Sequence, residues 1–72
     1  MDERNLSYRE FNKRLDGRPE ELRRGQFAFN LMEDLQPEFA ESIRGTELDP
    51  FYDDGKLDNF FGAAHAWGAI TW

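Results

Sequence analysis

Apolar side chains recur every three or four residues along most of this chain, which is the spacing of one face of an α-helix. The first stretch begins after Ser7, whose hydroxyl can accept a hydrogen bond from the Glu10 amide while the Glu10 carboxylate reaches back, as in a capping box. Gly17 then predicts a left-handed stop. We therefore expect a helix over residues 8–16, with an apolar stripe of Tyr8, Phe11 and Leu15.

The next run, from Arg18 to Glu21, predicts the start of a long central helix. Pro19 is tolerated at a first helical position, and the two carboxylates that follow it complement the free amides of a first turn. The helix is expected to continue to Gln36. Gly25 inside it predicts either a bend or the close approach of another element, because glycine is unfavourable in a helix interior.

Pro37 can open a third, shorter helix, which Gly45 terminates in a left-handed conformation. Residues 46–55, termed the corner below, are rich in turn-forming residues. Asp49-Pro50 predicts a single helical turn in the corner, and Asp54-Gly55 predicts a left-handed exit from it.

A fourth helix and a short apolar tail complete the chain. The helix is predicted over about residues 56–66 and is expected to pack on the second helix. Its apolar stripe consists of Leu57, Phe60, Phe61, Ala64 and Trp67. The tail, residues 68–72, either folds back over the core or frays as many termini do.

These elements predict an all-α fold: a compact single domain of three to four short helices with an irregular acidic corner. The domain is expected to span residues 1–67, followed by the apolar C-terminal tail at 68–72. A chain of 72 residues buries only about 60% of its unfolded surface, and its 7 Phe, 2 Trp and 2 Tyr residues provide large rings for the core. The absence of cysteine from the sequence excludes disulfides and thiolate metal sites.

Charge divides the chain into two unequal parts. Residues 1–25 carry 7 Lys/Arg against 6 Asp/Glu, a net charge of +1, whereas residues 26–72 carry 2 against 9, a net charge of −7. The acidic part is either a solvated face that keeps a ring-rich chain soluble or a surface that docks onto a basic groove of a protein partner. For the second interpretation, the candidate partner-binding residues are Glu47, Asp49, Tyr52, Asp53, Asp54, Asp58 and Trp72.

Residue types that carry out catalysis or bind metals do not form a recognisable constellation. The aspartates around Gly55 fail the spacing of a calcium loop, because an EF-hand register places proline, tyrosine and phenylalanine at ligand positions. His65 is the only histidine and has no carboxylate within one helical turn in the sequence, and Ser7 and Ser42 form no nucleophile–base pattern. We therefore expect no enzyme, no catalytic residue, no metal and no cofactor.

Membranes and nucleic acids are not expected as direct partners. The N-terminal residues lack the basic start and apolar run of a signal peptide, and no apolar stretch approaches the roughly 20 residues of a membrane span. The acidic excess opposes binding to nucleic-acid phosphates. These features predict a cytoplasmic protein.

Two motifs carry a resemblance to known proteins. Residues 25–30 have the pattern Gly-Gln-x-x-Phe-Asn, and residues 45–52 have the pattern Gly-Thr-x-x-Asp-Pro-Phe-Tyr. In this order, over roughly residues 23–61, they resemble small, largely uncharacterised helical proteins of bacteriophages and bacteria. The resemblance implies a helical scaffold and no activity. Within it, Gln26 and Asn30 are interpreted as side chains that bond the loop backbone.

The leading hypothesis is a non-enzymatic, phage-type accessory or regulatory protein that binds a host or phage protein through an acidic, aromatic-bearing surface. One alternative is a nucleic-acid mimic that inhibits a defence or transcription enzyme by occupying its DNA or RNA groove. The other alternative is a structural homodimer that covers its excess rings.

Overall fold

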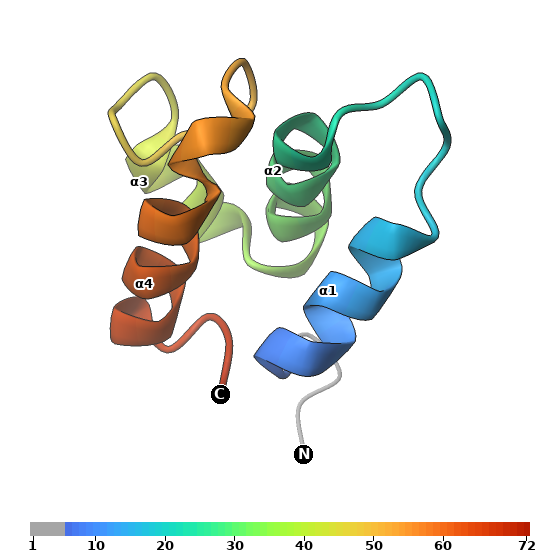
Figure 1. The fold of residues 1–72 in the computed structure, drawn as a ribbon. Coiled ribbons are helices and arrows are strands. Elements are labelled where there is room, and N and C mark those ends of the chain that lie inside the picture. Colours follow the sequence, from blue (N-terminus) through green and yellow to red (C-terminus); the bar gives the residue numbers. More distant parts are fainter. Residues whose placement is uncertain (1–5) are drawn as a thin grey trace.

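The computed structural model describes residues 6–72, which fold into four α-helices and one 3-10 turn with no strand among them (Figure 1). The predicted all-α class is confirmed. The elements are α1 (Tyr8–Asp16), α2 (Arg24–Leu35), α3 (Pro37–Ile43), η1 (Asp54–Lys56) and α4 (Leu57–Trp67). No helix in this part of the chain combines the length and hydropathy needed to cross a bilayer.

Helix α1 has the predicted bounds, and its predicted cap is present. The Glu10 amide donates to Ser7 Oγ at 3.1 Å. The left-handed stop at Gly17 is wrong, because this residue has φ −91°. The guanidinium of Arg18 instead donates to the Leu15 carbonyl at 2.9 Å, and this side chain covers the end of the helix in place of a left-handed glycine.

The predicted start of α2 at Pro19 is also wrong, since the helix begins five residues later at Arg24. The Leu22 amide donates to the Pro19 carbonyl at 3.1 Å, which closes an isolated turn. Arg18 Nε donates to the Leu22 carbonyl at 3.0 Å, so that carbonyl is bonded to a side chain. Side-chain hydrogen bonds of this kind compete with helix formation.

Helix α3 begins at Pro37, and Gly45 follows it with a left-handed φ of 76°, both as predicted. The left-handed exit at Asp54-Gly55 is wrong, because Gly45 and Gly68 are the left-handed residues in the described part of the chain. Asp53 accepts from the Gly55 amide at 2.8 Å and starts η1, which leads directly into α4.

The core is a cluster of rings and aliphatic side chains drawn from all four helices. The ring of Phe60 in α4 lies 6.1 Å from both Phe11 in α1 and Phe39 in α3. The ring of Phe61 meets Phe11 edge-on at 5.4 Å. The fourth helix was predicted to pack on the second, and α4 and α2 do contribute buried side chains to the same core cluster. The close ring contacts of α4 are with α1 and α3, and η1, just before α4, meets the start of α2.

The tail folds back over the core. Ala69 and Ile70 are fully buried. Thr71 donates its amide to the Leu6 carbonyl at 3.1 Å and accepts from the Tyr8 amide at 2.5 Å, which ties the tail to the start of α1. Residues 68–72 are therefore part of the domain and not a separate appendage. Figure 1 shows the tail and the start of α1 at one end of the fold and the corner at the other.

Candidate functional site: the corner

The first half of the corner is organised by one carboxylate. Asp49 Oδ2 accepts from the Gly45 amide at 2.8 Å, and Oδ1 accepts from the Phe51 amide at 2.9 Å. Pro50, which lies between Asp49 and Phe51 in the sequence, is fully buried. A bond from an aspartate to the amide two residues later is the usual device by which this residue stabilises a turn. Asp49 thus sets the path of the backbone from α3 into the corner.

The second half of the corner is joined to α2 by another aspartate. The Asp53 amide donates to the Pro50 carbonyl at 3.1 Å, which gives the single turn predicted after Asp49. Asp54 Oδ1 then accepts from the Gly25 amide in the first turn of α2 at 2.9 Å. A carboxylate at this place satisfies a free amide and complements the helix dipole. Asp54 therefore caps a helix that begins 30 residues before it.

Gly25 is the point of close approach that the sequence predicted. A Cβ atom built on this glycine would overlap the Pro50 carbonyl oxygen and lie 2.8 Å from Asp54 Oδ1. The absence of a side chain at this position lets the corner sit directly on the helix backbone.

Arg23, just before α2, bonds the corner from the other side. Its Nη2 donates to the Phe51 carbonyl at 2.7 Å, and its Nη1 donates to the Tyr52 carbonyl at 3.2 Å. The bonds to the loop backbone that were predicted for Gln26 and Asn30 are thus made by Arg23.

Two adjacent rings of the corner have opposite environments. Phe51 is half-buried and meets the ring of Phe29 edge-on at 6.0 Å. The ring of Tyr52 lies 4.7 Å from that of Phe51, yet Tyr52 is 81% exposed. Phe51 therefore anchors the corner to the core, while Tyr52 presents an aromatic surface to solvent from a backbone held by hydrogen bonds.

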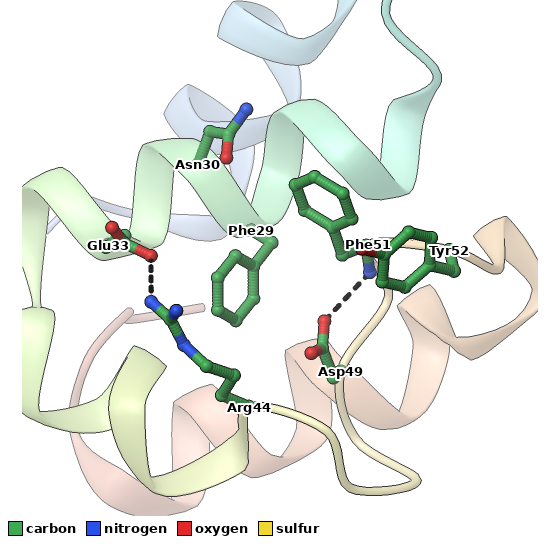
Figure 2. Close-up of a pocket in the computed structure, with 7 residues that line it drawn as sticks. All are labelled: Phe29, Asn30, Glu33, Arg44, Asp49, Phe51 and Tyr52. Carbon is green, nitrogen blue, oxygen red and sulfur yellow. Dashed lines mark hydrogen bonds and ion pairs between the residues drawn. The ribbon is translucent and has the colours of Figure 1, made fainter.

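Two shallow hollows adjoin Tyr52. The first has a volume of about 230 Å³ and is lined by Phe29, Asn30, Glu33, Arg44, Asp49, Phe51 and Tyr52 (Figure 2). The second has a volume of about 240 Å³ and is lined by Arg44, Gly45, Thr46, Asp49, Tyr52, Asp53 and Lys56. Tyr52 borders both hollows, so a ligand in either one would lie beside this residue.

Arg44 is the cation common to both hollows, and it is already paired. Its Nη2 lies 2.7 Å from Glu33 Oε2, and its Nε lies 3.4 Å from Glu41 Oε2. Its guanidinium carbon is 5.6 Å from the centroid of the Phe29 ring, a cation–π arrangement. Part of the negative charge around the corner is thereby neutralised within the molecule.

The predicted partner-binding residues lie in different places, and three of them, Asp49, Tyr52 and Asp53, line one hollow together. Those in the corner are Glu47, Asp49, Tyr52, Asp53 and Asp54, and Asp58 follows in the first turn of α4. Trp72 lies apart, at the C-terminal end of the chain beside the start of α1 (Figure 1). It is 63% exposed, stacks on His65 at 4.3 Å and meets Tyr8 edge-on at 5.3 Å.

Sequence reasoning did not assign Phe29 and Arg44 to this site. They precede the corner in the sequence and belong to α2 and the end of α3, so no local spacing connects them with Tyr52. Only the packing of Phe29 on Phe51 brings these residues into one hollow.

The chemistry available at the corner is packing and hydrogen bonding. In residues 6–72, no three His, Asp or Glu side chains gather closely enough to hold a metal ion. Ser42 Oγ donates to the Phe39 carbonyl at 2.7 Å, which is a local bond within α3. His65 stacks on Trp72, far from the corner along α4.

The comparisons with known proteins add no relative from which a function could be inferred. No protein-family model, curated protein or solved structure matches this chain.

Proposed function

We propose that this chain is a small non-enzymatic binding module that engages a partner protein through the corner, with Tyr52 as the anchor. The observation that carries this proposal is the combination of a highly exposed ring with a fixed backbone. Tyr52 is 81% exposed, whereas its carbonyl accepts a hydrogen bond from Arg23 and the turn before it is closed by Asp49.

A ring presented in this way suits protein recognition. Tyrosine offers a large, rigid contact area with few rotatable bonds, so little entropy is lost when it is buried by a partner. Hydrogen bonds that fix the corner in advance reduce the ordering that binding would otherwise require. Tyr and Arg are also the residue types enriched among the few side chains that dominate binding energy.

The carboxylates of the corner favour this proposal over a nucleic-acid mimic. A mimic needs carboxylates that face outward in the spacing of phosphates, whereas Asp49, Asp53 and Asp54 each accept hydrogen bonds from backbone amides of this chain. Their first role is to build the corner. The charge that remains steers a basic partner toward the surface without being the main source of affinity.

The test is photo-crosslinking at the proposed anchor. Tyr52 is replaced by p-benzoylphenylalanine, and the protein is irradiated in bacterial lysate at about 50 and 300 mM salt, where the Debye length is roughly 14 and 6 Å. We expect one dominant crosslinked protein that persists at the higher salt. The control carries the same probe at Asn59, an exposed position of α4.

The outcomes separate the proposal from its alternatives. Equal crosslinking yields from positions 52 and 59 would contradict the proposal. The absence of a crosslink from both positions would also contradict it. A crosslink to a second copy of this chain would instead favour the homodimer. A crosslink to a DNA- or RNA-binding enzyme that disappears completely at the higher salt would favour the mimic. A phage or host regulatory protein crosslinked at both salts would support the proposed accessory role.

A further inference from the structure

The first hollow already contains an arginine of this chain, and the way that arginine is held indicates what a partner could insert beside it. The guanidinium of Arg44 lies over the ring of Phe29 at 5.6 Å and bonds Glu33 at 2.7 Å. Among the residues that line the hollow, one aromatic face and one carboxylate therefore hold one planar cation, and Glu41 outside the hollow pairs with its Nε. This combination is well suited to arginine, whose flat guanidinium stacks on rings and donates in a fork.

The other side of the same hollow also combines an aromatic surface with a carboxylate. The rings of Phe51 and Tyr52, 4.7 Å apart, provide the aromatic surface, and Asp49 provides the carboxylate (Figure 2). Each Asp49 oxygen accepts one amide hydrogen bond, whereas a carboxylate can accept about four bonds in total. Asp49 thus has acceptor capacity left for a ligand.

We propose, as a refinement of the function proposed above, that the first hollow binds the guanidinium of a partner's arginine between the Tyr52 ring and Asp49. Arg44 is the only Lys or Arg that lines this hollow among the described residues, and it is paired with Glu33 and Glu41. The second hollow is less suitable, because Lys56 also lines it and would repel an incoming cation.

Charge favours the same occupant at longer range. Residues 26–72 carry a net charge of −7, and they supply every residue that lines the hollow. A cationic side chain is therefore attracted to this part of the surface before contact. The ring of Tyr52 then provides the cation–π contact that selects a flat cation at short range.

The test uses a single amino-acid probe, so it does not depend on finding the natural partner. N-acetyl-arginine amide is titrated into isotope-labelled protein, and backbone amide shifts are followed by NMR. The matched probe is N-acetyl-citrulline amide, which has nearly the same shape without the charge. We expect saturable shifts at Phe51, Tyr52 and Asn30 with the arginine probe, and at least about fivefold weaker binding of citrulline.

Two variants localise the effect. Tyr52→Ala removes an exposed ring and leaves the core intact, and it should weaken binding of the arginine probe by about fivefold or more. Asp34→Asn removes one exposed negative charge outside the hollow. The affinity of this variant for the arginine probe should stay within about twofold of that of the unsubstituted protein.

Three results would overturn the inference: no saturable shift at the hollow, equal binding of citrulline, or equal weakening by the two variants. None of them would overturn the function proposed above if the crosslink at position 52 persists. A persistent crosslink combined with any of these three results would show that a partner binds at Tyr52 but inserts no arginine into the hollow. Loss of the crosslink together with retained arginine binding would instead refute the proposed protein partner.

Discussion

The contact between Gly25 and the corner gives the sharpest prediction of stability. In Gly25→Ala, the new methyl group would overlap the Pro50 carbonyl oxygen and lie 2.8 Å from Asp54 Oδ1. The first of these is backbone of a buried proline, so it cannot swing aside as a flexible side chain would. Either the corner moves away from α2 or the start of the helix unwinds.

The expected change in the free energy of unfolding of Gly25→Ala is the difference between opposing effects. Alanine is more favourable than glycine within a helix by up to about 1 kcal/mol. Overpacking of a tight site is unfavourable by about 1–3 kcal/mol. Moving the corner would also lengthen the bond from the Gly25 amide to Asp54, and a hydrogen bond to a charged group contributes about 1.5–3 kcal/mol. We expect a net destabilisation of about 2 kcal/mol.

The assay is thermal and urea unfolding followed by circular dichroism. For a domain of this size, about 1 kcal/mol shifts the melting temperature by roughly 4–8 °C, so Gly25→Ala should lower it by about 8–16 °C. The control is Gly62→Ala in α4, where a Cβ atom would have no neighbour within 4 Å. This variant should be stabilised by about 0.5–1 kcal/mol. If both variants shift in the same direction, the proposed close approach is refuted.

Three further substitutions test other parts of the fold. Gly45→Val places a β-branched residue at a φ of 76° and should destabilise the domain by about 1–2 kcal/mol, measured by urea unfolding; an unchanged midpoint would contradict the left-handed turn. Ile70→Ala truncates a buried side chain of the tail and should lower stability by about 2–4 kcal/mol, whereas a near-neutral effect would mean that the tail lies outside the core. Arg23→Gln removes the two bonds to the corner carbonyls, so hydrogen exchange of the Tyr52 and Asp53 amides should accelerate while global stability changes by about 1 kcal/mol or less; unchanged exchange would show that Arg23 does not hold the corner.

The elements predicted correctly are those whose signals lie within a few residues of the helix end. Ser7 and Glu10 are three residues apart, and the structure contains the predicted bond between them. Pro37 and Gly45 bound α3 through backbone preferences that each residue carries itself. The apolar stripe of α4 is recognised from its period in the same way, and Phe60, Phe61 and Ala64 are buried as it predicts, whereas Trp67 at its end is 54% exposed.

The error at the start of α2 has one local cause and one distant cause. The predicted start at Pro19 rested on a local signal, but the Arg18 side chain closes that segment into a turn. The amide of Gly25, which needs a partner at the start of α2, finds one in Asp54. No pattern within a short window contains both residues, so the true start at Arg24 could not be located from spacing.

The candidate site shows the same division. Sequence reasoning identified the corner and Tyr52 from their turn-forming and aromatic residues. It gave Asp49, Asp53 and Asp54 a turn-forming role as well as a partner-binding one, and the structure shows their oxygens accepting bonds from backbone amides. The exposed Trp72, also among the predicted residues, lies at the other end of the fold (Figure 1).

The sequence by itself determined the helical class, the bounds of α1 and α3 and the existence of an irregular acidic corner. These properties follow from hydrogen bonds and periodicities that span at most one or two helical turns. The tertiary structure alone decided which ring of the corner is buried, what Arg23 and Arg44 bond, and where a hollow opens. Those features depend on Phe29 meeting Phe51 and on Asp54 meeting Gly25. Such contacts join residues far apart in the chain, so they exist only once the helices have packed.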